Sequence, residues 1–176
     1  MKFMAVLAAV ATATAPWGVP ATTDASVSHA AEVHCVVEVQ PTGSDERQAS
    51  PRCFPTKAEA DGFLDASITK ADELSLSALS SVAIGTVYAD VNYGGSSLTM
   101  WGSSGCAGVT FGFASLGGGW DSRVSSARGS NGCWVTLYRG TGYSGDRLNC
   151  TPACSSVGSL NDQVRSLVLR PWGTLG

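Results

Sequence analysis

The chain has 176 residues, a net charge of −3 and only 14% charged residues, whereas glycine alone fills 21 positions. This mildly acidic balance argues against nucleic-acid binding, which needs a basic surface, and no cationic helix of the kind that lies on membranes is visible. The length is sufficient for one domain with a sizeable core and a smaller additional piece.

Residues 1–30 have the pattern of a signal peptide. Lys2 precedes an apolar stretch over 3–15 that is too short to span a bilayer. Small residues at Ser28 and Ala30 place cleavage after Ala30, with a site after Ala25 as the alternative. We therefore expect a secreted, extracellular protein with no membrane segment after cleavage.

The cysteines all follow this leader. They are Cys35, Cys53, Cys106, Cys133, Cys150 and Cys154. An even number of cysteines in an exported chain predicts disulfide bonds, but six cysteines allow 15 pairings and the sequence does not choose among them. Proximity favours Cys35 with Cys53, which leaves Cys106 with Cys133 and Cys150 with Cys154 as a working scheme.

The part over 31–83 has a mixed character. The valines that follow Cys35 predict a short strand. Thr56 and Glu59 have the spacing of a capping box, which predicts a helix over 57–66, and the residues up to 81 are expected to be helical or a linker. We expect a small α+β segment, pinned by a disulfide, without chemistry of its own.

Beyond residue 84 the composition shifts to Gly, Ser, Thr and aromatic residues, with short apolar alternations between turns, which is typical of an all-β domain. A hairpin motif recurs at an offset of fifty residues, and its key positions are Tyr88, Tyr93 and Gly95, then Tyr138, Tyr143 and Gly145. A second motif, Asp-Ser-Arg-Val-Ser-Ser over 121–126, recurs as Asn-Asp-Gln-Val-Arg-Ser over 161–166. An internal repeat of this kind predicts two similar structural units.

One such unit cannot bury its apolar face, but two packed face to face can. Four strands per unit, with one strand exchanged between the sheets, give a double Greek-key β-sandwich. We expect Greek key 1 over about 84–130 and Greek key 2 over about 133–171, within a domain over 84–172. The paired motifs resemble the βγ-crystallin superfamily, and within it the small secreted bacterial members that include metalloproteinase inhibitors and killer-toxin-like proteins. The N-terminal segment lies outside this resemblance.

The resemblance implies Ca²⁺ as a cofactor. In calcium-binding members a site takes a carbonyl from the third position of one motif, a hydroxyl from its fifth position and a side chain from the second position of the partner motif, and all of these are oxygen donors. The first site would consist of the Arg123 carbonyl, the Ser125 hydroxyl and the Asp162 carboxylate. The same residues also suit tight turns that bind nothing.

The second site is expected to be degenerate. It would use the Gln163 carbonyl, but its hydroxyl position is Arg165, which has no acceptor. Its carboxylate position is Ser122. We therefore expect one competent calcium site, in which a single carboxylate takes part.

An enzyme is not expected. His34 is the only histidine after the leader and lies beside a cysteine that is expected to form a disulfide, so a catalytic base is missing. The β region contains no glutamate, and its aspartates are Asp90, Asp121, Asp146 and Asp162. Two of these lie in the calcium motifs, which leaves no obvious pair for glycoside hydrolysis.

The first function that we expect is that of a monomeric, secreted calcium-binding module. The alternative is a proteinase inhibitor that offers a rigid loop to an extracellular protease. In that case the loop over 102–119 would carry Val109, Phe111 and Phe113, although their alternation equally predicts a core strand. A weaker alternative is a killer-toxin-like antimicrobial protein that binds a cell-wall component through Trp101, Trp120 or Trp134.

Overall fold

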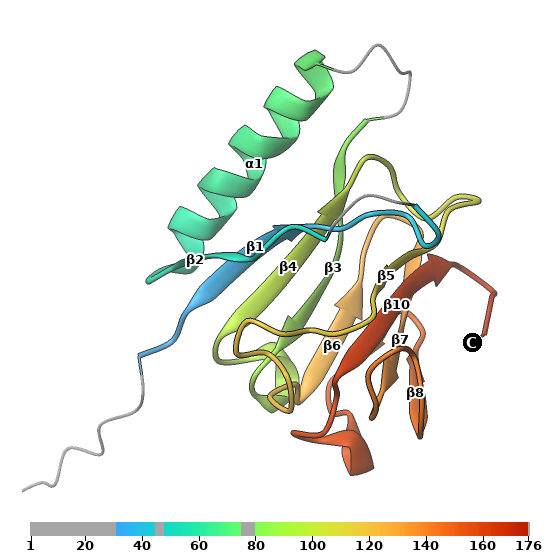
Figure 1. Ribbon diagram of the computed structural model, residues 1–176. Coiled ribbons are helices and arrows are strands. Elements are labelled where there is room, and N and C mark those ends of the chain that lie inside the picture. Colours follow the sequence, from blue (N-terminus) through green and yellow to red (C-terminus); the bar gives the residue numbers. More distant parts are fainter. Residues whose placement is uncertain (1–30, 45–47, 75–79, 176) are drawn as a thin grey trace, which may run out of the picture. The chain divides into compact units, whose positions relative to one another are not determined.

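The computed structural model describes residues 31–44, 48–74 and 80–175 (Figure 1). The predicted signal peptide lies outside these residues. The described chain contains one α-helix and two sheets, with strand orders β2-β1-β4-β3-β6-β9 and β5-β10-β7-β8. The bounds are β1 (His34–Glu38), β2 (Arg52–Phe54), α1 (Lys57–Leu74), β3 (Val82–Tyr88), β4 (Ser97–Gly102), β5 (Phe111–Phe113), β6 (Ser126–Gly129), β7 (Cys133–Tyr138), β8 (Arg147–Cys150), β9 (Ala153–Cys154) and β10 (Ser166–Pro171), with short 3₁₀ turns at Val91–Tyr93 and Gly158–Leu160.

The strand order confirms the predicted double Greek key. The first unit, β3 to β6, places β4, β3 and β6 side by side in the larger sheet and sends β5 to the edge of the other sheet, beside β10. The second unit, β7 to β10, places β10, β7 and β8 side by side in the smaller sheet and sends β9 to the edge of the larger sheet, beside β6. This exchange of the third strand makes the two units depend on each other for complete sheets.

The interior between the two sheets is apolar. Inward-facing residues such as Val87, Leu98 and Leu167 have no exposed surface, and Trp120 has only 1%. Along β7 the residues Val135 and Leu137 point into this core, as the two-residue period of a strand requires.

The hairpin tyrosines pack on each other in both units. The ring centroids of Tyr88 and Tyr93 are 5.7 Å apart, and those of Tyr138 and Tyr143 are 6.0 Å apart, both in edge-on arrangements. Gly145 and Gly95, whose φ angles are 79° and 69°, provide the left-handed backbone that the fold-back needs. The repeated hairpin motif therefore holds an edge-to-face pair of tyrosine rings in each unit. We refer to each pair as a tyrosine corner, a name that here describes the ring packing alone.

The N-terminal segment extends the larger sheet. β1 runs parallel to β4, with His34 opposite Ser97, and β2 pairs with the other edge of β1. α1 lies alongside these strands (Figure 1) and buries Ala60 and Leu64 against Trp101. The helix continues to Leu74, into the stretch after residue 66 that was expected to be either helical or a linker.

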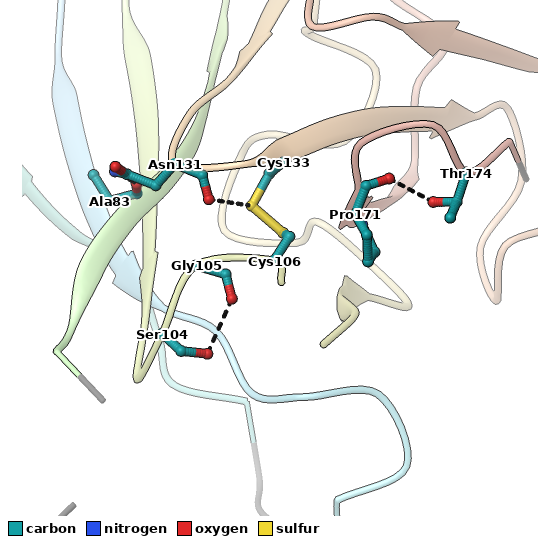
Figure 2. Close-up of a disulfide and its surroundings, with 8 residues drawn as sticks. All are labelled: Ala83, Ser104, Gly105, Cys106, Asn131, Cys133, Pro171 and Thr174. Carbon is teal, nitrogen blue, oxygen red and sulfur yellow. Dashed lines mark hydrogen bonds between the residues drawn. A yellow bond between two sulfur atoms is a disulfide. The ribbon is translucent and has the colours of Figure 1, made fainter. Parts of the chain in front are cut away.

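The three disulfides are those of the working scheme, Cys35–Cys53, Cys106–Cys133 and Cys150–Cys154, and the described residues include no free cysteine. Figure 2 shows the second of these, which joins the loop after β4 to the start of β7 and so connects the two Greek keys. Within the described ranges, no helix has both the length and the apolarity needed to cross a membrane.

Candidate functional site

The two Asp/Asn-rich motifs lie against each other and are joined by reciprocal backbone hydrogen bonds. The N–H of Ser122 donates to the carbonyl of Val164 at 2.9 Å, and the N–H of Asp162 donates to the carbonyl of Val124 at 3.2 Å. The second position of each motif is thus held beside the fourth position of the other. This is the pairing that a site shared between the motifs requires.

Both second positions also have the same unusual backbone. Ser122 has a φ of 58° and Asp162 a φ of 54°, in the left-handed region that Asn and Asp tolerate better than most residues. Asp162 fits this conformation, whereas Ser122 is a less suitable residue for it. The two halves therefore match in backbone geometry and differ in side-chain chemistry.

The oxygen atoms of the predicted first calcium site are available. Within the described residues, neither the Arg123 carbonyl nor the Ser125 hydroxyl has a hydrogen bond, although Ser125 is only 5% exposed. The Asp162 carboxylate is exposed and, in the part of the chain that the structure describes, accepts only the Asn161 amide, at 2.7 Å. A carbonyl, a hydroxyl and a carboxylate are donors that Ca²⁺ prefers, so this residue set fits the ion.

The predicted second site lacks this donor set. The N–H of Arg165 donates to the Tyr138 carbonyl at 2.9 Å, as the N–H of Ser125 does to the Tyr88 carbonyl at 2.8 Å, so the two backbone positions are equivalent. Arg165 nevertheless offers a cation where Ser125 offers a hydroxyl. Among the described residues, no group of three or more His, Cys, Asp or Glu side chains could hold a metal.

Of the side chains expected to enter a protease, Val109 is half-buried in the loop before β5, whereas the two phenylalanines are not on the surface. Phe111 is fully buried and Phe113 is 2% exposed, because both lie in β5 and face the core. The prediction that they fill a protease pocket is therefore wrong, and the alternative prediction of a core strand is correct. Trp120 and Trp101 are buried as well, at 1% and 7% exposure, which removes them as sugar-binding surfaces.

A loop for which no site was predicted is both exposed and constrained by the surrounding structure. Thr151 and Pro152 are exposed between β8 and β9, inside the five-residue ring closed by the Cys150–Cys154 disulfide. The Pro152 carbonyl accepts the Gly129 N–H at 2.8 Å, and Cys150 is fully buried. The loop is thus exposed at its tip and fixed at its base. The short cysteine spacing was the available sequence clue.

One family model and several solved structures are similar to parts of this chain. The model of peptidase inhibitor family I36 matches residues 87–151. Similar solved structures include the N-terminal domain of protein S, at 20% identity and a TM-score of 0.40, covering 51% of this chain and 97% of that one. A βγ-crystallin domain from Clostridium beijerinckii, in a double-mutant form, has 22% identity and a TM-score of 0.41, covering 51% and 98%. A βγ-crystallin from an archaeon has 26% identity and a TM-score of 0.38, covering 51% and 98%. No curated protein matches.

Proposed function

We propose that this protein is a secreted inhibitor of an extracellular peptidase. The observation that carries the proposal is the match of residues 87–151 to a peptidase inhibitor family. The three disulfides support an oxidising, extracellular environment. The expected leader over 1–30 supports export, since its pattern is that of a signal peptide.

The Cys150–Cys154 loop is the segment that we place in the peptidase cleft. An inhibitory loop must be exposed to enter the cleft, and it must be rigid so that little conformational entropy is lost on binding. Thr151 and Pro152 meet the first condition. The disulfide and the hydrogen bond from the Gly129 N–H meet the second.

The test is an inhibition screen of the mature protein against secreted metallopeptidases and serine peptidases. We expect saturable inhibition of at least one enzyme, metallopeptidases being the first class to examine. Failure to inhibit any enzyme of either class, by protein with intact disulfides, would contradict the proposed function.

A pair of variants then tests the loop. Thr151→Trp should weaken inhibition by roughly tenfold or more, as expected for a residue at the centre of an interface. The matched control is Ala107→Trp, which alters an exposed residue beside the Cys106–Cys133 disulfide. If Ala107→Trp abolishes inhibition and Thr151→Trp does not, the inhibitory loop is the one in Greek key 1.

Calcium binding is the second proposed property, and it is compatible with inhibition. Its support is the reciprocal backbone pairing of the two motifs, in which the Asp162 N–H donates to the carbonyl of Val124, the residue between Arg123 and Ser125 in the chain. Because these ligands come from both Greek keys, a bound ion would connect the two units and stabilise the domain. Gln163, the corresponding carbonyl donor of the second site, is left without a hydroxyl partner at residue 165.

A further inference from the structure

A cavity of about 410 Å³ lies where the N-terminal segment meets Greek key 1. Its walls come from β1, the start of α1, the first tyrosine corner and β4, and they include Glu32, His34, Lys57, Tyr88, Tyr93 and Ser97. The volume lies within the range of about 300–1,000 Å³ that is usual for small-molecule sites. Neither the calcium motifs nor the Cys150–Cys154 loop contributes to it.

The internal repeat explains why there is space at this place. Ser97 lies opposite Tyr88 in the first hairpin, and Arg147 lies opposite Tyr138 in the second, so Ser97 and Arg147 are equivalent positions. The first hairpin therefore has a short side chain where the second has a long one. The N-terminal segment then supplies His34 as a further wall, which Greek key 2 does not have.

The tyrosine hydroxyls of this cavity have no partner within the described chain. Tyr88 and Tyr93 are half-buried and make no hydrogen bond through their hydroxyls there, whereas the Tyr138 hydroxyl accepts from Arg170 at 3.2 Å. The hydroxyls of the first corner are thus free to bind a ligand, because a polar atom in a cleft needs a partner when water leaves.

The imidazole of His34 is oriented by the protein through Nδ1, and its Nε2 makes no hydrogen bond within the described residues. Its Nδ1 lies 2.9 Å from the Ser97 hydroxyl, while its Nε2 is 3.9 Å from the Glu32 carboxylate, too far for a hydrogen bond. The ammonium of Lys57 and the carboxylate of Glu32 bring opposite charges to the cavity, and Lys57 also pairs with Asp61. The walls therefore favour neither an anion nor a cation.

We propose that this cavity binds a neutral saccharide. Sugar hydroxyls can both donate and accept, which suits the free tyrosine hydroxyls, the carboxylate and the ammonium together. The Arg128 guanidinium lies 4.4 Å from the centre of the Tyr93 ring, and the remaining apolar surface of the two tyrosine rings provides contact area for the C–H groups of a sugar ring. Balanced wall charges and several hydroxyl partners around an aromatic pair match this ligand class better than a charged metabolite.

The test is a titration of the ¹⁵N-labelled mature protein with neutral trisaccharides of glucose, of xylose and of N-acetylglucosamine, followed by two-dimensional NMR. We expect saturable shifts of the Gly94, Gly95 and Ser97 amides with at least one of them. No saturable shift with any of the three, or equal shifts with acetate or glycine as the probe, overturns the proposal.

Two variants locate the binding. Ser97→Arg copies the second hairpin and should abolish the shifts, and its matched control, Arg147→Ser, should leave them unchanged. Tyr88→Phe keeps the ring and removes only a hydroxyl without a protein partner, so it should fold normally and weaken binding roughly five- to tenfold, the value of one hydrogen bond. Binding that is unchanged in Tyr88→Phe and in folded Ser97→Arg overturns the proposal.

Discussion

The hydroxyl of Ser126 donates to the Asp90 carbonyl at 2.6 Å and accepts the Tyr93 N–H at 3.0 Å. Ser166 makes the same two bonds, at 2.6 and 3.0 Å, with the hairpin of Greek key 2. Both serines are fully buried. The last residue of each Asp/Asn motif thus fastens the tyrosine corner of its own unit, which explains physically why the two motifs recur together.

Removing one of these hydroxyls should destabilise the domain. Ser126→Ala leaves the Asp90 carbonyl and the Tyr93 N–H without the partner that the buried hydroxyl provides, which typically costs about 1–3 kcal/mol of unfolding free energy. Ser166→Ala should have a similar effect because its bonds are equivalent. Equilibrium urea denaturation measures both. Ser144→Ala is the control, since the Ser144 hydroxyl bonds an exposed carbonyl of its own hairpin and should change stability by no more than about 0.5 kcal/mol.

The disulfides should differ in their contribution to stability. Cys106 and Cys133 are 27 residues apart, whereas Cys150 and Cys154 are only four apart. In the chain-entropy model these loops correspond to about 3.5 and about 2 kcal/mol, respectively. Replacing each pair by serine and comparing melting temperatures tests this order. A larger loss on removing the shorter bridge would show that local geometry outweighs loop entropy.

The double Greek key could be predicted because the hairpin motif and the Asp/Asn motif each occur twice in the sequence. Tyr88 with Tyr93 and Tyr138 with Tyr143 are local motifs whose partners are close in the chain, so their spacing carries the information. The disulfide scheme was correct for a similar reason, since each bridge joins cysteines that are neighbours in sequence order.

The attachment of the N-terminal segment could not be predicted in this way. The parallel pairing of β1 with β4 joins residues such as His34 and Ser97, which are 63 positions apart, mainly through backbone hydrogen bonds that leave no side-chain pattern. The helix continues to Leu74, which is 76% exposed, so its last turns have little apolar periodicity to reveal them. The cavity beside His34 is formed by this attachment, so it could not be predicted from the sequence either.

Stability should fall at high pH through Tyr143. Burial, with a smaller effect from Tyr138, raises the pKa of Tyr143 above its ordinary value of 10.0. Below pH 10 both the folded and the unfolded states are protonated, and above it the unfolded chain ionises first, so unfolding becomes more favourable as pH rises. Tyr143→Phe should make the decline in unfolding free energy above pH 10 less steep. Parallel curves for the two proteins would show that the folded-state pKa is not raised.

Calcium should raise the melting temperature of the wild-type protein relative to the protein in chelator. An ion that binds only the folded state stabilises by mass action, by about 2.7 kcal/mol at one hundred times the dissociation constant. With one carboxylate in the site, we expect affinity in the range of extracellular modules, about 10⁻⁴ M or somewhat tighter. Differential scanning fluorimetry at increasing calcium measures the shift, and its absence in the wild type would show that the motifs are only turns.

Substitutions in the two motifs should have different effects on calcium binding. Asp162→Ala deletes the only carboxylate of the first site and should remove the calcium-dependent shift, whereas Asp146→Ala, which alters an exposed carboxylate paired with Arg139, should retain it. Ser122→Asp combined with Arg165→Ser gives the second site the donors that it lacks, and aspartate also suits the left-handed backbone at residue 122 better than serine. Isothermal titration calorimetry should then detect one bound ion in the wild type and two in the double variant. Two equivalent ions in the wild type would show that Arg165 does not block the second site.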